Sequence, residues 1–174
     1  KAKDLGYTKL PYQAVNPSAH TEHTVALIVS RPDSASFWTG IIHRMAQELA
    51  EYNINLMYIY VPSVFTRDFA LPSILSKDSV EGIAVVNVYD PVILGMVNDL
   101  PGPKVFLDTI PSLTDRKLHG DLILIEGFRT ESEITDLLIQ DGHTDIGFLG
   151  DINYAQTNKE RYLGYRDSMD RNGL

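Results

Sequence analysis

The chain has 174 residues, of which 44% are hydrophobic, and it contains no cysteine. This length suits one domain or two small lobes with a buried core, and the composition excludes a fibrous protein, a disulfide-stapled scaffold and a thiolate zinc site. The 15 basic and 23 acidic residues give a net charge of −8, so the body should repel nucleic acid unless a separate basic element makes the contact.

The first 23 residues are predicted to contain the end of a helix followed by a linker. Residues 1–7 are typical of the last turns of a helix that stops at Gly6. Residues 8–23 contain prolines and polar residues without hydrophobic periodicity, as linkers do. The sequence has no initiator methionine, so we expect it to be a piece of a longer chain.

From residue 24 onwards, apolar runs of strand length alternate with segments of helical periodicity. The run 25–29 is apolar throughout, which is typical of a strand buried on both faces. Apolar residues then repeat at helical spacing from Trp38 to Leu49. Pro72 should kink or break a helix predicted over 66–77. Further strands are predicted over 54–61, 82–88, 104–108, 121–126 and 144–149, and further helices over 92–98, 131–140 and 157–171.

This regular alternation favours an α/β fold with a parallel sheet and right-handed crossovers. For the helix over 131–140, Thr130 and Glu133 match a capping box. No stretch approaches the roughly 18 consecutive apolar residues of a membrane span, and no apolar leader opens the sequence. We therefore expect a soluble, cytoplasmic protein with no membrane partner.

The sequence lacks the common signatures of catalysis and of cofactor binding. It contains no G-x-S-x-G elbow, no Walker loop and no H-E-x-x-H pair, and no G-x-G-x-x-G follows the first strand. The linker histidines His20 and His23 fit solvent exposure better than a metal site. We therefore expect no enzyme, no metal and no cofactor. An enzyme that uses Asp33, Asp108 or Glu126 as a general acid or base stays an alternative.

Polar and aromatic side chains gather where the predicted strands end. In parallel sheets this carboxyl edge is where small ligands sit. Amides, carboxylates and an arginine offer paired donors and acceptors for vicinal hydroxyls, and aromatic faces cover the apolar side of a pyranose ring. We therefore expect a sugar-like ligand. The residues at this edge are Arg31, Asp33, Ser34, Ser36, Phe37, Trp38, Asn87, Tyr89, Asp90, Asp108, Thr109, Asp151, Asn153, Tyr154, Thr157 and Arg161.

Several of these residues also suit purely structural roles. Phe37-Trp38 opens a predicted amphipathic helix, where core packing is the alternative. Thr157 with a glutamate three residues later matches a capping box, so it could serve only its own helix. Asp33 and Asp108 are residue types that loops after strands often contain.

Five segments resemble motifs of the LacI/GalR family of bacterial transcriptional regulators. The sequence DGHTDIGFLG at 141–150 is close to the family's LGHRRIAFIGG, and RYLGY at 161–165 resembles R-x-x-G-[FY]. These two motifs, at their mutual spacing, are the most specific. Residues 3–7, 24–38 and 80–83 resemble the end of the DNA-binding headpiece, the first core strand with its helix start, and a VDGII motif.

The resemblance covers nearly the whole chain and implies a two-lobed core with the type I periplasmic-binding-protein fold. Residues 1–7 would be the remnant of a helix-turn-helix headpiece, and residues 8–23 the linker or hinge. Residues 24–126 would form the N-terminal lobe, and residues 127–174 the first part of a C-terminal lobe that is incomplete in this chain.

Carried over by position, the resemblance also implies the effector contacts. Arg161 lies three residues before Gly164, where the family places its ligand-binding arginine. Glu126 stands where many members have Asp-Asn at the first crossing between lobes. The predicted ligand-binding residues are Asp33, Ser36, Phe37, Asn87, Asp108, Glu126, Thr157 and Arg161.

The resemblance therefore implies a regulator that binds operator DNA as a homodimer, through a headpiece absent from this chain. A sugar-like effector would change its affinity for the operator. The segment 10–17 lacks the Ala-Arg pair of many family hinges, so a minor-groove hinge helix is not carried over. The alternative is the solute-binding protein of a sugar transporter, which an upstream signal peptide would indicate.

Overall fold

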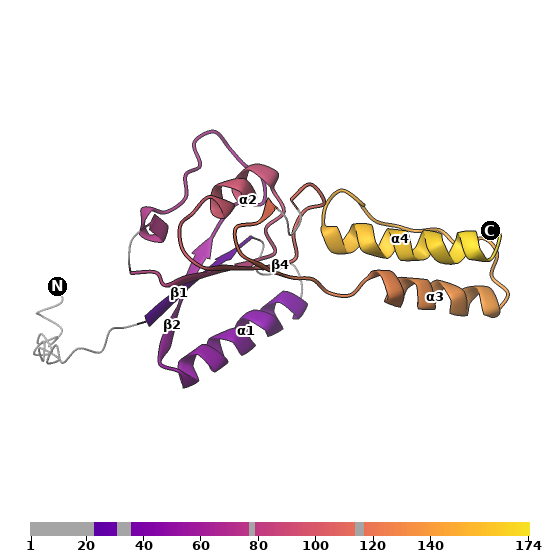
Figure 1. The fold of residues 1–174 in the computed structure, drawn as a ribbon, viewed down its shortest axis with the longest axis horizontal. Helices are drawn as coiled ribbons and strands as arrows, with labels where there is room; N and C mark the ends of the chain where they lie inside the picture. The colour runs from indigo at the N-terminus through magenta and orange to yellow at the C-terminus, as the bar shows by residue number, and fades with distance from the viewer. Residues whose placement is uncertain (1–22, 31–35, 77–78, 114–116) are drawn as a thin grey trace, which may run out of the picture.

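The computed structural model describes residues 23–30, 36–76, 79–113 and 117–174. The predicted headpiece remnant, nearly all of the predicted linker, and the predicted ligand residue Asp33 lie outside the described residues. Within them the chain forms one sheet with helices on both faces, followed by a pair of helices (Figure 1).

The sheet has five strands, all parallel, in the order β2-β1-β3-β4-β5. Their bounds are β1 His23–Val29, β2 Ile54–Tyr60, β3 Gly82–Val86, β4 Lys104–Leu107 and β5 Asp121–Ile123. Residues Ala26 to Val29 of β1 are fully buried, as the continuous apolar run predicts. The predicted α/β fold with a parallel sheet is confirmed.

Strand order fixes where a ligand site can form. The chain goes from β1 to one neighbour, β2, and then crosses back to β3 on the other side before adding β4 and β5. The carboxyl ends of β1 and β3 therefore lie at the point where the winding direction reverses. Loops diverge there and leave a crevice, which is where open parallel sheets bind ligands.

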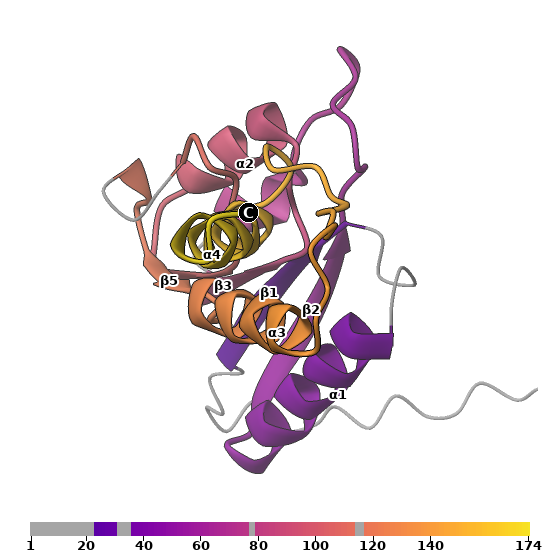
Figure 2. The same ribbon diagram turned by 90° about the vertical axis from the view of Figure 1, so that its right-hand side faces the viewer.

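The two faces of the sheet are covered unequally. Helix α2 (Pro91–Asn98) lies on one face and α1 (Ser36–Glu51) on the other (Figures 1 and 2). Asp90 fixes the start of α2, because its Oδ1 accepts hydrogen bonds from the backbone N–H of Val92 and Ile93 at 2.9 and 3.0 Å. The main core lies on the α2 side and includes Ile28, Val85, Ile93, Leu94, Val97 and Phe106, whereas α1 has no buried residue.

The helix predicted over 66–77 does not form in the described residues 66–76, in keeping with the expectation that Pro72 would kink or break it. That region contains only a short 3₁₀ turn, Ser73–Ser76, and the residues before it are irregular. The physical reason is Pro72, which cannot donate the i→i−4 hydrogen bond and clashes with the preceding turn.

The strand predicted over 144–149 is also wrong. This segment runs beside α4 (Gln156–Arg171) without pairing to any described strand, and Tyr165 holds it by donating its hydroxyl to the Ile146 carbonyl at 2.7 Å. The segment contains Ile146, Phe148 and Leu149, but it also contains Asp145 and Gly147, which are disfavoured in strands, and a segment becomes a strand only when a neighbour pairs with it.

The helices α3 (Phe128–Gln140) and α4 run side by side in the same direction, away from the sheet (Figure 1). A polar clamp fastens their far ends: Ser168 Oγ donates to Asp136 Oδ1 at 2.5 Å, and Arg171 pairs with Asp136 at 3.0 Å. Gly164, in the middle of α4, touches the backbone of Phe128, the first residue of α3, where a Cβ would clash. Both helices begin beside the sheet edge, with their N-termini pointing towards it (Figure 1).

The start of α3 differs from the predicted capping box. The helix begins at Phe128, and the carboxylate of Glu126 accepts hydrogen bonds from the backbone N–H of Arg129 and Thr130 at 2.5 and 3.0 Å. Glu133 instead pairs with Arg129 on the helix surface. Among the described helices, none is long and apolar enough to cross a membrane.

Candidate functional site

A cavity of about 360 Å³ lies where the carboxyl ends of β3 and β4 meet the first turns of α1 and α4. This is the point where the strand order reverses, as expected for a ligand site in an open parallel sheet. The residues that line it are Phe37, Trp38, Asn87, Tyr89, Asp108, Tyr154, Ala155, Asn158 and Arg161. Four of the eight predicted ligand residues are therefore brought together: Phe37, Asn87, Asp108 and Arg161.

Asp108 accepts more hydrogen bonds through its side chain than the other described residues of the cavity wall do. It follows β4 with a left-handed backbone (φ 65°), which aspartate tolerates better than most residues, and only 6% of it is exposed. Its carboxylate accepts hydrogen bonds from the Tyr89 hydroxyl at 3.1 Å, from the Thr109 N–H at 2.8 Å and from the Thr157 N–H at 3.3 Å. Because three donors satisfy it, this buried carboxylate joins two strand ends to the start of α4.

Tyr89 stays a neutral donor in this arrangement. Burial, and then the negative charge of Asp108, raise the pKa of the Tyr89 phenol well above its ordinary value. The ring of Tyr89 also packs against the ring of Tyr154, with an angle of 45° between the ring planes and the centroids 4.6 Å apart. The pair presents aromatic surface to the cavity, which can cover a sugar ring or another flat ligand.

Asn87 ties the end of β3 to the end of β1. It is nearly fully buried, has a left-handed backbone (φ 55°), and its Nδ2 donates to the Ser30 carbonyl at 2.8 Å. At the cavity mouth Phe37 is 50% exposed and contacts Trp38 edge to face, with centroids 5.0 Å apart. For Phe37 this placement disfavours the alternative of core packing, whereas Trp38 is half-buried.

The start of α4 is anchored on the sheet edge. Its first residue, Gln156, donates its N–H to the Thr109 carbonyl at 2.6 Å, and the N-cap is Ala155. The capping-box alternative for Thr157 is wrong, because Thr157 lies inside the helix and its buried Oγ1 has no hydrogen-bond partner among the described residues. Thr157 does not line the cavity, but its backbone N–H supports Asp108.

Arg161 lies in the second turn of α4 and lines the cavity. Its guanidinium forms no hydrogen bond or ion pair with any residue that the structure describes. The stem is held by packing instead: a Cβ added at Gly127 would come within 3.1 Å of the Arg161 Cγ. Gly127 has ordinary dihedral angles for any residue (φ −118°), so the close approach rather than the backbone explains the glycine.

The remaining predicted ligand residues lie elsewhere. Glu126 is exposed, and both of its carboxylate oxygens accept hydrogen bonds from the start of α3. The hydrogen bond from the Thr130 hydroxyl is the main reason that the pKa of Glu126 lies below its usual range. Ser36 is the exposed first residue of α1 and does not line the cavity. Asn158, which the sequence reasoning missed, lies three residues before Arg161 and so shares its helix face.

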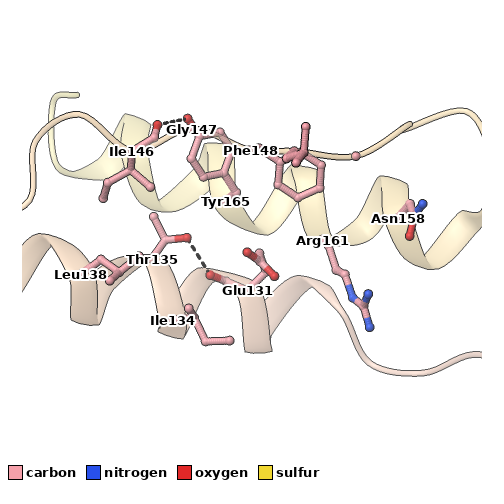
Figure 3. A pocket seen from close by; sticks show the side chains of 12 residues that line it. Glu131, Ile134, Thr135, Leu138, Ile146, Gly147, Phe148, Asn158, Arg161 and Tyr165 are labelled. Atoms are coloured by element: carbon pink, nitrogen blue, oxygen red, sulfur yellow. Dashed lines mark hydrogen bonds between the residues drawn. The ribbon is translucent and has the colours of Figure 1, made fainter. Parts of the chain in front are cut away.

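A second cavity of about 310 Å³ adjoins the first, because Asn158 and Arg161 line both. It lies between α3, α4 and the extended segment 146–150 (Figure 3). Its walls combine apolar side chains, such as Ile134 and Phe148, with the polar side chains of Glu131 and Thr135. Arg161 stands at the end of this cavity where both helices begin (Figure 3). Within the described ranges, no cluster of three or more His, Cys, Asp or Glu could hold a metal ion.

The sequence is similar to those of known transcriptional regulators. The chain is 26% identical over 170 residues to the HTH-type transcriptional repressor PurR of Pectobacterium atrosepticum, covering 96% of this chain and 48% of that protein. It is 25% identical over 177 residues to the HTH-type transcriptional regulator RegA of Clostridium saccharobutylicum, covering 99% of this chain and 51% of that protein. The chain is therefore similar in sequence to HTH-type transcriptional regulators.

A solved structure agrees on the fold. The Escherichia coli transcriptional repressor AscG matches 87% of this chain and 55% of its own, with a TM-score of 0.62 at 18% sequence identity. The expected periplasmic-binding-protein-like fold is thereby confirmed. No family model matches the chain. The chain spans about half the length of the curated relatives it matches.

Proposed function

We propose that this chain is the effector-binding core of a LacI/GalR-type transcriptional regulator. A sugar-like small molecule binds in the cavity between the sheet edge and α4 and changes the affinity of the protein for operator DNA. The observation that carries this proposal is the cavity itself, which gathers Phe37, Asn87, Asp108 and Arg161 at the reversal point of the sheet. The relatives, which are transcriptional regulators rather than enzymes, support the same role.

The geometry suggests how binding is transmitted. Asp108 and Thr109 hold the start of α4 on the sheet edge through two hydrogen bonds, to the N–H of Thr157 and Gln156. A ligand that contacts both Arg161 and the sheet edge can therefore change how the start of α4 is held against the sheet. Any change in operator affinity caused by the ligand must be matched by an equal change in ligand affinity caused by the operator.

The division into parts and the partners are also proposals. Residues 24–126 are the N-terminal lobe, and residues 127–174 are the first part of a second lobe. The unpaired segment 144–149 and the fully exposed side chain of Leu149 support this division. The intact protein acts in the cytoplasm as a homodimer, and it contacts DNA through a helix-turn-helix headpiece, because a body of charge −8 repels DNA by itself.

A ligand screen of the intact protein tests the binding site. The melting temperature is measured with a panel of mono- and disaccharides, sugar phosphates, uronic acids and nucleobases. At least one compound should raise it, since a ligand that binds only the folded state stabilises that state. Arg161→Ala should abolish the shift and change the melting temperature of the free protein only slightly, because its guanidinium has no hydrogen-bond or ion-pair partner among the described residues and only its stem packs against Gly127.

The matched control is Arg166→Ala, which removes an arginine from the same helix that pairs with Asp170 rather than lining the cavity. It should leave the ligand shift intact. The proposal would be contradicted if no compound of the panel raised the melting temperature, or if the shift persisted in Arg161→Ala. Ligand binding with no effect on any DNA interaction would instead favour the solute-binding protein of a transporter.

A further inference from the structure

The helix α4 has no hydrogen-bonding cap of its own at its first turn. Its N-cap residue, Ala155, has the extended backbone that suits this position (φ −139°, ψ 149°), but its side chain cannot accept a hydrogen bond. The Ala155 carbonyl accepts from the Lys159 N–H at 3.1 Å, so the N–H groups of residues 156–158 lie ahead of the intrahelical hydrogen bonds. These donors need acceptors from elsewhere in the fold.

Two of the acceptors come from the end of β4. The Gln156 N–H donates to the Thr109 carbonyl at 2.6 Å, and the Thr157 N–H donates to Asp108 Oδ1 at 3.3 Å. An N-cap side chain normally accepts from the second or third N–H of its own helix, and Thr157 is the second residue of α4. Asp108, which lies 49 residues earlier in the chain, therefore takes the place of an N-cap carboxylate.

The side chains of this first turn do not satisfy one another. Thr157 Oγ1 and Gln156 Oε1 are both buried and have no hydrogen-bond partner among the described residues. Burying a polar oxygen without a partner costs free energy. The sheet edge therefore keeps the turn in this arrangement, and both oxygens would gain water if the turn moved away from it.

The acceptor Asp108 is itself fixed on the sheet. The Tyr89 hydroxyl donates to its Oδ2 at 3.1 Å and the Thr109 N–H donates to its Oδ1 at 2.8 Å, so the carboxylate keeps its orientation towards α4. Tyr154, directly before the N-cap residue, packs its ring against Tyr89. The contacts that hold the start of α4 thus belong to the end of the sheet rather than to the helix.

We propose that Asp108 and Thr109 are positioning residues that cap α4 from the sheet, so that separation of α4 from the sheet edge uncaps the helix and frays its first turn. This turn carries Asn158, and Arg161 follows in the next turn; both line the proposed ligand cavity. A ligand that binds the ordered turn therefore also holds α4 against the sheet. This consequence for ligand binding rests on the proposed function, whereas the capping does not.

Hydrogen exchange of the intact protein without ligand, followed for single amides by NMR, tests the capping. Asp108→Gly removes the carboxylate, and a glycine adopts the left-handed backbone of this position (φ 65°) without strain. The loss of a helix cap should speed exchange at the Thr157 amide, and at the Lys159 amide in the turn that frays, by about three- to thirtyfold. Asp108→Asn keeps the shape with a weaker, neutral acceptor, so it should give an intermediate rate, and it replaces the glycine variant if that variant does not fold.

A rescue and an internal control separate capping from general destabilisation. Ala155→Ser gives α4 a cap of its own, so in the Asp108→Gly background it should bring Thr157 exchange back to within about threefold of the wild-type rate. The Arg129 and Thr130 amides at the start of α3 are capped locally by Glu126, and their exchange should change less than about twofold. Unchanged exchange at Thr157, failure of the rescue, or equal acceleration in both helices would overturn the capping.

The coupling to ligand binding is tested on the same amides. Addition of the tightest compound of the panel to the wild type should slow exchange at Thr157 and Lys159, because the compound binds the ordered turn. Exchange that stays the same while the cavity is saturated would overturn the coupling. A panel without any binding compound would contradict the proposed function instead, since the exchange measured without ligand decides on the capping alone.

Discussion

At the scale of single residues, the site depends on one buried carboxylate more than on its exposed polar groups. Asp108 was predicted as a ligand contact, but its three hydrogen bonds show that its carboxylate already serves the junction between the sheet and α4. The sequence indicated that a carboxylate lies at this edge. It could not indicate which donors would reach it, because Tyr89 and Thr157 are 19 and 49 residues away along the chain.

Removing the tyrosine donor tests this junction. Tyr89→Phe leaves the ring but deprives the buried Asp108 carboxylate of a hydrogen bond, so the free energy of unfolding should fall by about 1–3 kcal/mol. Tyr154→Phe is the control, since it keeps the ring that packs against Tyr89 and removes a hydroxyl that is not bonded to Asp108. Chemical denaturation measures both variants, and equal effects would contradict the role of the Tyr89 hydroxyl.

The same pair predicts an alkaline pH dependence. The folded protein raises the pKa of Tyr89 above its unfolded value of about 10, so the unfolded chain releases this proton at a lower pH than the folded one does. The stabilisation is therefore fully present below pH 10 and is lost as the pH rises beyond it. Wild-type stability should decline more steeply than that of Tyr89→Phe above about pH 10. Parallel curves would be inconsistent with a shifted pKa.

At the scale of elements, the sequence predicted local structure well and pairing poorly. The fully apolar run 25–29 identified the most buried strand, because burial on both faces leaves a signature in composition. The segment 144–149 is also predicted to be a strand, although it contains Asp145 and Gly147, and it does not pair with any described strand. Strand formation depends on partners that are distant along the chain. In residues 66–77 the cause is local instead, because Pro72 prevents a helix that the spacing of apolar residues predicts.

The contact between α3 and α4 gives a prediction for two glycines. Gly164→Ala should destabilise the protein by about 1–3 kcal/mol, because the added Cβ would clash with the backbone carbonyl of Phe128 and separate the helices. Gly40→Ala, in the middle of α1 with open space around it, should instead stabilise by about 0.5–1 kcal/mol. Thermal unfolding distinguishes the two, and a neutral Gly164→Ala would show that the helices do not pack this closely.

At the scale of the whole molecule, the two parts of the chain meet at the proposed ligand site. The sheet contributes Asn87, Tyr89 and Asp108, and the helical pair contributes Asn158 and Arg161. A ligand bound between them can favour one relative position of the parts over another, which is how a binding site acquires influence over a distant DNA-binding element. The net charge of −8 is compatible with a chain that binds the ligand, because the DNA contact is proposed to lie outside the acidic body.

The most direct test of this account is the operator affinity of the intact protein, measured by fluorescence anisotropy with and without the tightest ligand of the panel. Typical coupling between two sites changes affinity by roughly 5–150-fold, and a change in this range is expected for the wild type. Arg161→Ala should bind the operator as the free wild type does and should not respond to the ligand. An operator affinity that stays constant while the cavity fills with ligand would contradict the account.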